Sequence, residues 1–449
     1  MPDYKKKHVN RLRGAPKPKR AKKTAENISQ DIEMQPSPAR AKRAKAEPAK
    51  NESPLKVVKG KKLERRRKTR IALSAAAVII IAVTVLHLVL PVGIAENIGN
   101  LTALIGAGGY PVTLESSDTL NTVSRGGYYY VLSDTRLCAY SGGGKEIYSY
   151  MHGYENPVLK TSKTRALIFS QGGNEAAVYN LRSKKGTVKS DNEIITAGIS
   201  DSGVYAVVTR SDKYASVVTV YDKRNKRIYE WSSATDTVNN VAVSPNGKKI
   251  AVSLFSAASG KFTSKISVLE FDSASPKYTD VIDGSLVYTL DGFHNSGFSA
   301  LTENGYIFTE WSGFKKTEYK SDFSPAFLRS GSGGIAAVFN RESDRTDNRV
   351  VLFTKKGQVK SEFEFKGIIS DIQVFGGHIY CISDTAVYLL SDSGGVLRKS
   401  ECGFGAVRLA VLGSNTAAVI TDNKIEIIIF MSKKYMSNRL LCGLAFLFM

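Results

Sequence analysis

The sequence predicts an all-β protein, an eight-bladed β-propeller placed after a basic tail and one transmembrane helix. A strand–turn–strand pattern recurs eight times, 24 of the 63 Lys and Arg residues fall in the first 70 residues of the 449-residue chain, and an uncharged apolar stretch follows them. We expect a disordered basic cytoplasmic tail over 1–70, a transmembrane helix over 71–91, an amphipathic connector over 92–108, the propeller over 109–430 and an apolar tail over 431–449.

The tail holds 24 of the 63 basic residues but only 7 of the 41 acidic ones, with Tyr4 as its one aromatic residue. Such a composition buries too little apolar surface to offset the entropy of ordering, so we expect disorder. A solvated tail that sets membrane topology is the simplest interpretation. Anionic lipid headgroups are a possible partner, and nucleic acid is the weaker alternative. The cations expected to contact lipid are Lys61, Lys62, Arg65, Arg66, Arg67, Lys68 and Arg70.

The apolar stretch IALSAAAVIIIAVTVLHLVL begins at Ile71 and has 20 residues without a formal charge. As a helix it would rise about 30 Å, the thickness of a bilayer core. The preceding KGKKLERRRKTR has eight Lys and Arg in twelve residues, which predicts a cytoplasmic amino terminus and an extracytoplasmic propeller at the cell membrane. A cleaved signal peptide is the alternative, because Gly93-Ile94-Ala95 resembles a cleavage site, although the leader and the apolar stretch are both long for one.

The connector carries a helical apolar stripe of Ile94, Ile98, Leu101 and Ile105 before a glycine-rich segment. This spacing predicts a short amphipathic helix. We expect the helix to pack on the membrane or on the domain that follows.

Eight hairpin patterns, such as VAVSPNGKKIAVSLF at 241–255, organise the rest of the chain. Their turns are marked by Gly127, Thr164, Gly203, Gly247, Asn295, Gly333, Gly377 and Asn415. The markers are 37 to 48 residues apart, the length of a four-stranded blade, and two further strand-like runs follow most copies. The last copy lacks a fourth strand. We expect GYPVTLES at 109–116 to supply it and close the ring, with seven blades as the fallback count.

This period and strand pattern resemble those of WD-repeat and quinoprotein-like propellers. The layout also looks like that of membrane-anchored bacterial propeller proteins of uncharacterised function. The resemblance implies the fold over roughly 109–430 but no reaction, because the sequence contains neither a Trp-Asp dipeptide nor a Trp-rich docking motif.

The residue types that usually carry chemistry do not group in this sequence. Cys138, Cys381, Cys402 and Cys442 show no metal-ligand spacing, and Cys381 and Cys402 belong to non-adjacent strands, beyond disulfide reach. The histidines of the propeller fall in different blades. We therefore expect no catalytic residue, no metal and no cofactor, and a protein that is not an enzyme.

Three connections between second and third strands are longer than the others: RSDKYA, SAASGKFTS and NRESDRTDN. They belong to the third, fourth and sixth blades, so they should rise on one half of one face. Functional residues concentrate on loops held by a rigid scaffold. The expected contact patch for a protein or an anionic wall polymer comprises Arg210, Lys213, Tyr214, Lys261, Phe262, Arg341 and Arg345.

These features predict a non-catalytic binding or scaffolding module at the cell envelope. An envelope enzyme acting on glycan or peptide, or a surface sensor that signals through the span, remain alternatives. Acidic or His side chains converging on the central channel would favour the enzyme, and small or apolar lining residues would favour the binder. The apolar tail could cover the ring, enter the membrane or have no role.

Overall fold

The computed structural model describes residues 59–89, 92–115, 118–125, 127–258, 260–403 and 405–430. The chain divides into two units, Met1–Arg70 and Ile71–Met449. The described part of the first unit is the beginning of helix α1 (Lys59–Val89), so the expectation of disorder is wrong over 59–70. Lys, Arg, Leu and Glu are good helix formers, and this segment continues directly into the apolar stretch. The rest of the basic tail and the predicted tail over 431–449 lie outside the described residues.

Helix α1 contains one candidate membrane span, Arg67–Leu86, with a mean hydropathy of 2.2 and exposed side chains. Its length and composition suit a span, and a signal sequence meets the same criteria. Of the seven cations expected to contact lipid, Arg67, Lys68 and Arg70 have described side chains, all exposed. The side chains of the other four lie outside the described residues.

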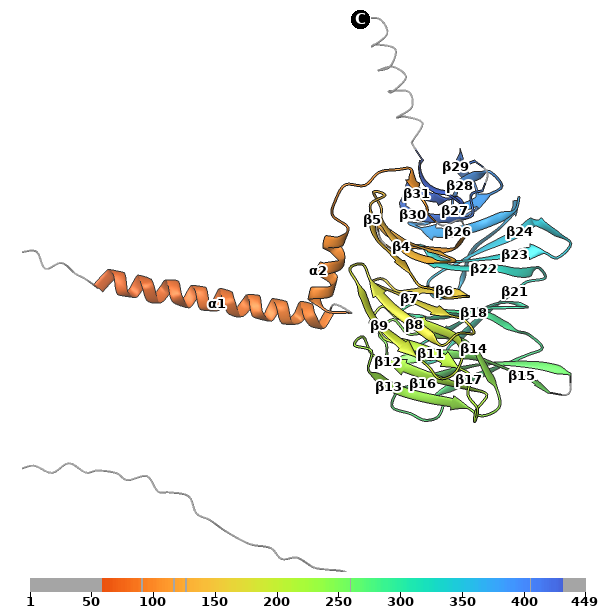
Figure 1. Cartoon of the computed structure of the whole chain (residues 1–449), viewed down its shortest axis with the longest axis horizontal. Helices are drawn as coiled ribbons and strands as arrows, with labels where there is room; N and C mark the ends of the chain where they lie inside the picture. Colours follow the sequence, from red (N-terminus) through yellow and green to blue (C-terminus); the bar gives the residue numbers. More distant parts are fainter. Residues whose placement is uncertain are drawn as a thin grey trace, which may run out of the picture. The chain divides into compact units, whose positions relative to one another are not determined.

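The described residues after α2 (Ile94–Ala103) form eight antiparallel sheets of four strands, which confirms the eight-bladed propeller (Figure 1). Blades 1 to 4 consist of β2 (Thr119–Ser124), β3 (Tyr128–Ser133), β4 (Arg136–Ser141) and β5 (Glu146–Met151); β6 (Pro157–Thr161), β7 (Arg165–Ser170), β8 (Glu175–Asn180) and β9 (Lys184–Lys189); β10 (Ile194–Ile199), β11 (Tyr205–Thr209), β12 (Ser216–Tyr221) and β13 (Arg227–Ser233); and β14 (Thr237–Val243), β15 (Lys249–Ala258), β16 (Lys261–Glu270) and β17 (Tyr278–Asp283).

Blades 5 to 8 consist of β18 (Val287–His294), β19 (Gly297–Thr302), β20 (Gly305–Glu310) and β21 (Lys316–Lys320); β22 (Ser324–Gly331), β23 (Gly334–Arg341), β24 (Asp344–Phe353) and β25 (Val359–Lys366); β26 (Ile369–Phe375), β27 (His378–Ser383), β28 (Ala386–Leu390) and β29 (Val396–Glu401); and β30 (Arg408–Gly413), β31 (Thr416–Ile420), β32 (Lys424–Ile429) and β1 (Val112–Thr113).

The ring closes through the exchange that the sequence predicts. Strand β1 pairs with β32, with Val112 opposite Ile425 and Thr113 opposite Lys424. Tyr110 and Val112 also pack against the apolar cluster that joins blades 8 and 1. Pairing of the two ends of the domain thus supplies the fourth strand of blade 8.

Inner strands of neighbouring blades approach closely around the central channel. A Cβ atom built on Gly331 would lie 1.9 Å from the backbone oxygen of Val374 in the next blade. At Gly198 and Gly292 the corresponding distances to backbone oxygens are 2.7 and 2.8 Å. Glycine at these three positions therefore permits the inner strands to converge. Farther from the channel, each apolar cluster joins the facing sheets of two neighbouring blades, as with blades 1 and 2.

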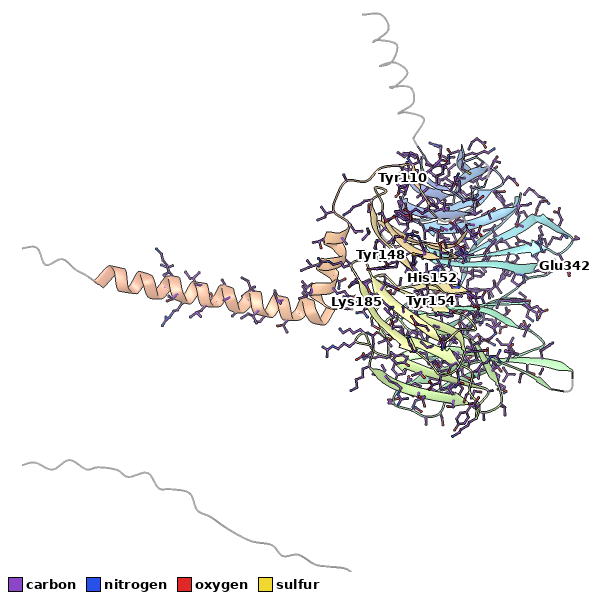
Figure 2. The ribbon with its side chains drawn as sticks, in the orientation of Figure 1. Tyr110, Tyr148, His152, Tyr154, Lys185 and Glu342 are labelled. Carbon is purple, nitrogen blue, oxygen red and sulfur yellow. The ribbon has the colours of Figure 1, made fainter. Side chains whose placement is uncertain are left out.

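The propeller has two faces, which we name by helix α2. The α2 face bears the turns between first and second strands and between third and fourth strands. The opposite face bears the turns between second and third strands and the connections between blades. Lys185, at the start of β9, lies beside α2, whereas Glu342, at the tip of the β23–β24 hairpin, projects on the other side (Figure 2).

Candidate functional site

The predicted contact patch lies on the opposite face, but its structural basis differs from the expectation. Only RSDKYA is a loop, between β11 and β12. The other two segments extend hairpins: β15 and β16 pair through ten residue pairs, ending at Ala258 opposite Lys261, and β23 and β24 pair as far as Arg341 opposite Asp344. Interpreting these two segments as loops was wrong, because backbone pairing continues through their polar residues.

The patch residues differ in how far they are engaged. Arg210 pairs with Glu193 at 2.9 Å, and Arg341 pairs at 2.7 Å with the buried Asp347. Lys366 also pairs with Asp347, at 2.9 Å, and Lys366 and Arg341 together lower the pKa of this carboxyl group, so Arg341 is engaged within its own blade. Lys213 and Arg345 form no ion pair with any described residue, and Tyr214 is exposed. The side chain of Lys261 lies outside the described residues.

Phe262 has a different surrounding from the other patch residues. It is 55% exposed and lines a cavity of about 430 Å³ on the opposite face. Phe255 and the 52% exposed Tyr288 line the same cavity. An aromatic-lined hollow of this size is typical of a binding site for a ligand or a partner side chain.

A second cavity of about 570 Å³ occupies the central channel and opens toward the α2 face. The inner strands of all eight blades line it. The residue four positions before each turn marker contributes to one ring: Val123, Lys160, Ile199, Val243, Asp291, Arg329, Gln373 and Val411. Lys160 lines both cavities, so it lies between the two ends of the channel.

The ring contains both apolar and charged side chains. It therefore matches neither the acidic or histidine-rich channel expected of an enzyme nor the small or apolar channel expected of a binding module. Arg329 approaches the buried Asp371 at 3.5 Å, and Asp371 also accepts the backbone N–H of Ile372 and of Leu409, each at 3.0 Å. Burial nevertheless raises the pKa of Asp371, against these partners. Gln373 joins three blades, because its Oε1 accepts from Ser124 Oγ at 2.8 Å and from the backbone N–H of Val411 at 3.1 Å.

The histidines and cysteines of the described region stay apart. No group of three His, Cys, Asp or Glu residues that could hold a metal occurs among the described residues. His294 is buried with Nε2 unpartnered, and desolvation lowers its pKa. Burial also lowers the pKa of His152, whose Nδ1 accepts the backbone N–H of Tyr154 at 3.0 Å. Cys138, Cys381 and Cys402 are free and buried, and Cys442 lies outside the described residues.

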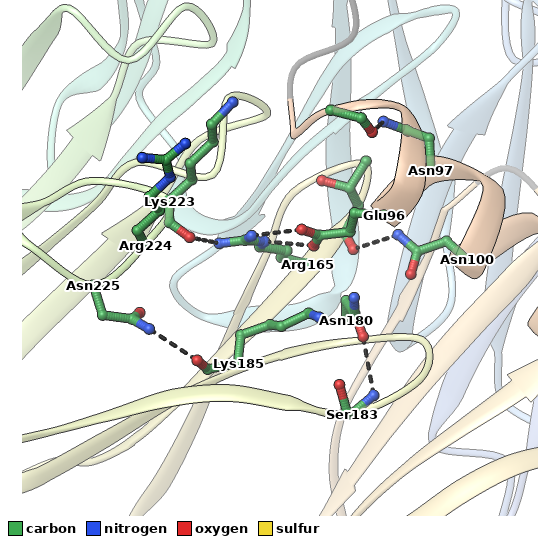
Figure 3. Close-up of polar contacts among 12 residues, drawn as sticks. Glu96, Asn97, Asn100, Arg165, Asn180, Ser183, Lys185, Lys223, Arg224 and Asn225 are labelled. Carbon is green, nitrogen blue, oxygen red and sulfur yellow. Dashed lines mark hydrogen bonds and ion pairs between the residues drawn. The ribbon is translucent and has the colours of Figure 1, made fainter. Parts of the chain in front are cut away.

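Helix α2 is fastened to its face of the propeller by polar contacts (Figure 3). Both carboxylate oxygens of Glu96 accept from Arg165, Oε1 from Nε and Oε2 from Nη2, each at 2.7 Å. Arg165 Nη1 also donates to the backbone oxygen of Lys223 at 2.8 Å. Asn100 Nδ2 donates to the Thr164 backbone oxygen, and Asn100 Oδ1 accepts the backbone N–H of Leu181, both at 3.1 Å.

The apolar stripe of the connector faces away from these contacts. Ile98, Leu101 and Ile105 are 56%, 66% and 70% exposed, whereas Gly99 and Asn100 are buried. The helix therefore packs on the propeller, one of the two expected positions, through its polar side and through Ala103 and Leu104 at its end, which contact the apolar cluster of blades 1 and 2. Exposure of such a stripe leaves it available to a second surface.

Sequence reasoning missed Arg125, Lys160 and the pairing of Glu96 with Arg165. The ring residues of the channel could have been predicted from the sequence repeat, because each of them precedes its turn marker by four positions. The pairing of Glu96 with Arg165 could not have been predicted in this way, since the two residues are 69 positions apart and follow no repeat.

The eight sheets and the central channel define the class of protein as an eight-bladed β-propeller. The chain belongs to a family of unknown function, DUF5711, whose match spans residues 110–430. No curated protein matches the sequence.

Solved structures with a similar fold include the C-terminal WD40 domain of Sif2, with a TM-score of 0.52 and 10% identity, covering 73% of this chain and 100% of that one. Others are BamB from Moraxella catarrhalis, at 0.49 and 15% with 73% and 100% coverage, and the dihydro-heme d1 dehydrogenase NirN, at 0.46 and 12% with 73% and 77% coverage. At these identities the likeness concerns the fold alone.

Proposed function

We propose that α1 anchors this chain in the cell membrane and that the propeller acts outside the cytoplasm as a non-catalytic binding module at the envelope. Its partner is a protein that docks on the opposite face, around Phe262 and Tyr288. The observation that carries this proposal is the orientation of α2, whose polar side is bound to one face of the propeller while its apolar stripe stays exposed.

The exposed stripe suits the boundary between lipid headgroups and acyl chains, where amphipathic helices lie. Four residues separate the end of α1 at Val89 from the start of α2 at Ile94, and the five steps between these two residues reach about 18 Å at most. Exposed cations surround α2 on the β8–β9 and β12–β13 turns, where they suit anionic headgroups: Arg182, Lys184, Lys185, Arg224 and Lys226.

The opposite face is then left for a partner. Aromatic residues are enriched at the energetic centres of protein interfaces, and Phe262 and Tyr288 are more than half exposed beside a cavity. The exposed Lys213 and Arg345 lie on the same face and remain proposed as contacts at its rim. The proposed role is non-catalytic because no group of three His, Cys, Asp or Glu residues that could hold a metal occurs among the described residues and their histidines lie in different blades, which supports binding rather than a reaction.

The membrane topology is tested with a single introduced thiol. Val396→Cys introduces a thiol at a position that is 58% exposed. Cys442→Ser removes the native cysteine that lies outside the described residues, and the other three cysteines can stay because they are buried. We expect labelling in intact cells by a membrane-impermeant maleimide. Labelling only after lysis would overturn the extracytoplasmic location.

Partner docking is tested by photocrosslinking in cells from the full chain. A benzophenone amino acid at position 262 or 288 should give the same discrete adduct, and one at Val396, equally exposed on an outer strand, should give none. Tyr288→Ala should remove the adduct formed from position 262. An adduct that is equally strong from position 396, or that Tyr288→Ala leaves unchanged, would refute docking on this face.

A further inference from the structure

Four cations line the cavity in the central channel: Arg329, which approaches the buried Asp371 at 3.5 Å, and Arg125, Lys160 and Lys163. Arg125 follows β2, Lys160 lies in β6 and Lys163 lies in the β6–β7 turn, and all three line the cavity of about 570 Å³. Because this cavity opens at the end of the channel on the α2 face, it is separate from the aromatic hollow proposed for the partner, although Lys160 lines both.

The acids of the cavity do not balance these cations. Lys163 pairs with Asp201 at 2.6 Å. Neither Arg125 nor Lys160 has a carboxylate within 4 Å among the described residues, and Asp291 is the acid whose charge acts most strongly on both. Asp291 itself accepts the backbone N–H of Phe293 at 3.0 Å. Two positive charges thus remain without a direct counter-ion.

The guanidinium of Arg125 is held in place but incompletely satisfied. It lies 5.0 Å from the ring centre of Phe293, and Lys163 Nζ lies 5.8 Å from the same ring. Its two terminal nitrogens donate long bonds to the backbone oxygens of Ser124, at 3.3 Å, and Thr161, at 3.4 Å. Its Nε is buried and has no partner. An arginine carries five N–H donors in a planar fork that suits an oxyanion, so donors remain for a ligand.

Desolvation is unfavourable for both charges. Burial lowers the pKa of Arg125 and of Lys160, and for each it outweighs the attraction of Asp291. An anion that accepts charge-assisted hydrogen bonds from these side chains would compensate for the lost solvation. Two unpaired cations match the charge of a phosphate monoester, about −1.5 to −2 at neutral pH.

We propose that this end of the channel binds a phosphate group and that Arg125, Lys160 and Lys163 hold it. The phosphate belongs either to a lipid headgroup or to a soluble phosphate-bearing molecule, since the site opens on the α2 face. The lipid source rests on the proposed membrane anchoring, whereas the site itself does not.

The test measures thermal unfolding of the full chain in phosphate-free maltoside micelles, with inorganic phosphate as the probe and sodium chloride at equal ionic strength as the reference. We expect phosphate to raise the unfolding midpoint of the native chain. Lys160→Met should raise the midpoint without phosphate, because it removes an unpaired desolvated charge, and should weaken phosphate binding about tenfold or more. Arg125→Gln should weaken binding to a similar degree.

Lys356→Met, at an exposed site outside the channel, serves as the matched control and should leave the phosphate response unchanged. The response that remains in the Arg125→Gln/Lys160→Met double variant measures the general stabilisation that phosphate gives any protein. Equal responses in the native chain and the double variant would overturn the proposal. So would a Lys160→Met chain that is less stable than the native one yet keeps the full response.

A second arm places the native chain in nanodiscs that contain phosphatidic acid, whose headgroup is a phosphate monoester. Loss of the response to inorganic phosphate there, with the response intact in micelles, would identify lipid phosphate as the occupant. A persisting response would identify a soluble phosphate-bearing ligand. A chain that fails to insert into nanodiscs would contradict the proposed anchoring, while the micelle experiment would still report on the site.

Discussion

Replacing Glu96 by glutamine should release α2 from the propeller while leaving the blades folded. The side chains of Arg165 and Glu96 are 4% and 12% exposed, and two hydrogen bonds of 2.7 Å join them. Removal of one partner from a buried ion pair costs about 3–5 kcal/mol, because the other charge stays buried without compensation. Arg165 would retain its bond to the backbone oxygen of Lys223.

This cost should appear locally, since α2 has only ten residues and such a helix is marginal without its packing. The appropriate assay is hydrogen exchange of the backbone amides of 94–103 in the full chain. A loss of about 3–5 kcal/mol corresponds to exchange that is roughly 10²-fold to more than 10³-fold faster, at about 1.4 kcal/mol per tenfold. The amides of the inner strands should exchange at unchanged rates.

Glu230→Gln provides a matched control, because Glu230 pairs with Arg227 at 2.9 Å at the surface, with the two side chains 48% and 66% exposed. Exposed pairs contribute less than about 1 kcal/mol, so this change should alter local exchange by less than about sixfold. The Glu96→Met/Arg165→Met variant should recover much of the protection, since no charge is left buried. Acceleration below about tenfold in Glu96→Gln, or acceleration spread through the blades, would refute the reasoning.

Three further changes address the ring. Gly331→Ala should lower the free energy of unfolding by about 1–3 kcal/mol in urea titrations, because its Cβ would clash with the backbone of Val374; an unchanged midpoint would show that the strands separate freely. Val112→Asp should destabilise the closure by about 1–3 kcal/mol, since it puts a carboxylate against the apolar cluster around Ile425, and scanning calorimetry should show it. Burial lowers the pKa of Lys160, so the unfolded chain holds that proton more tightly than the folded one. The free energy of unfolding should therefore rise with pH below the ordinary pKa of 10.5. This rise should be smaller in Lys160→Met, and identical pH profiles for the two chains would contradict the prediction.

The repeat period made the blade count and the closure by β1 predictable, because turn residues recur at each hairpin and the last copy visibly lacks a strand. The β15–β16 and β23–β24 hairpins were misread because polar residues on an exposed two-stranded extension resemble a loop in composition. The charged channel residues Lys160 and Arg329 could have been predicted, since both occupy the same repeat position, four residues before a turn marker. Pairing between Glu96 and Arg165 depends on tertiary placement, which no local pattern encodes.

The sequence predicts the apolar stripe of α2. The direction in which this stripe faces depends on which side of the helix binds to the propeller. An apolar contact would permit several helix positions of similar energy, whereas a bidentate ion pair and the two hydrogen bonds of Asn100 define one. Because these polar contacts fix the helix, Ile98 and Leu101 are not needed for docking and remain exposed. Because the polar side of α2 is bound to its own domain, the exposed apolar side is available to a second apolar phase, and the proposed membrane surface would supply one.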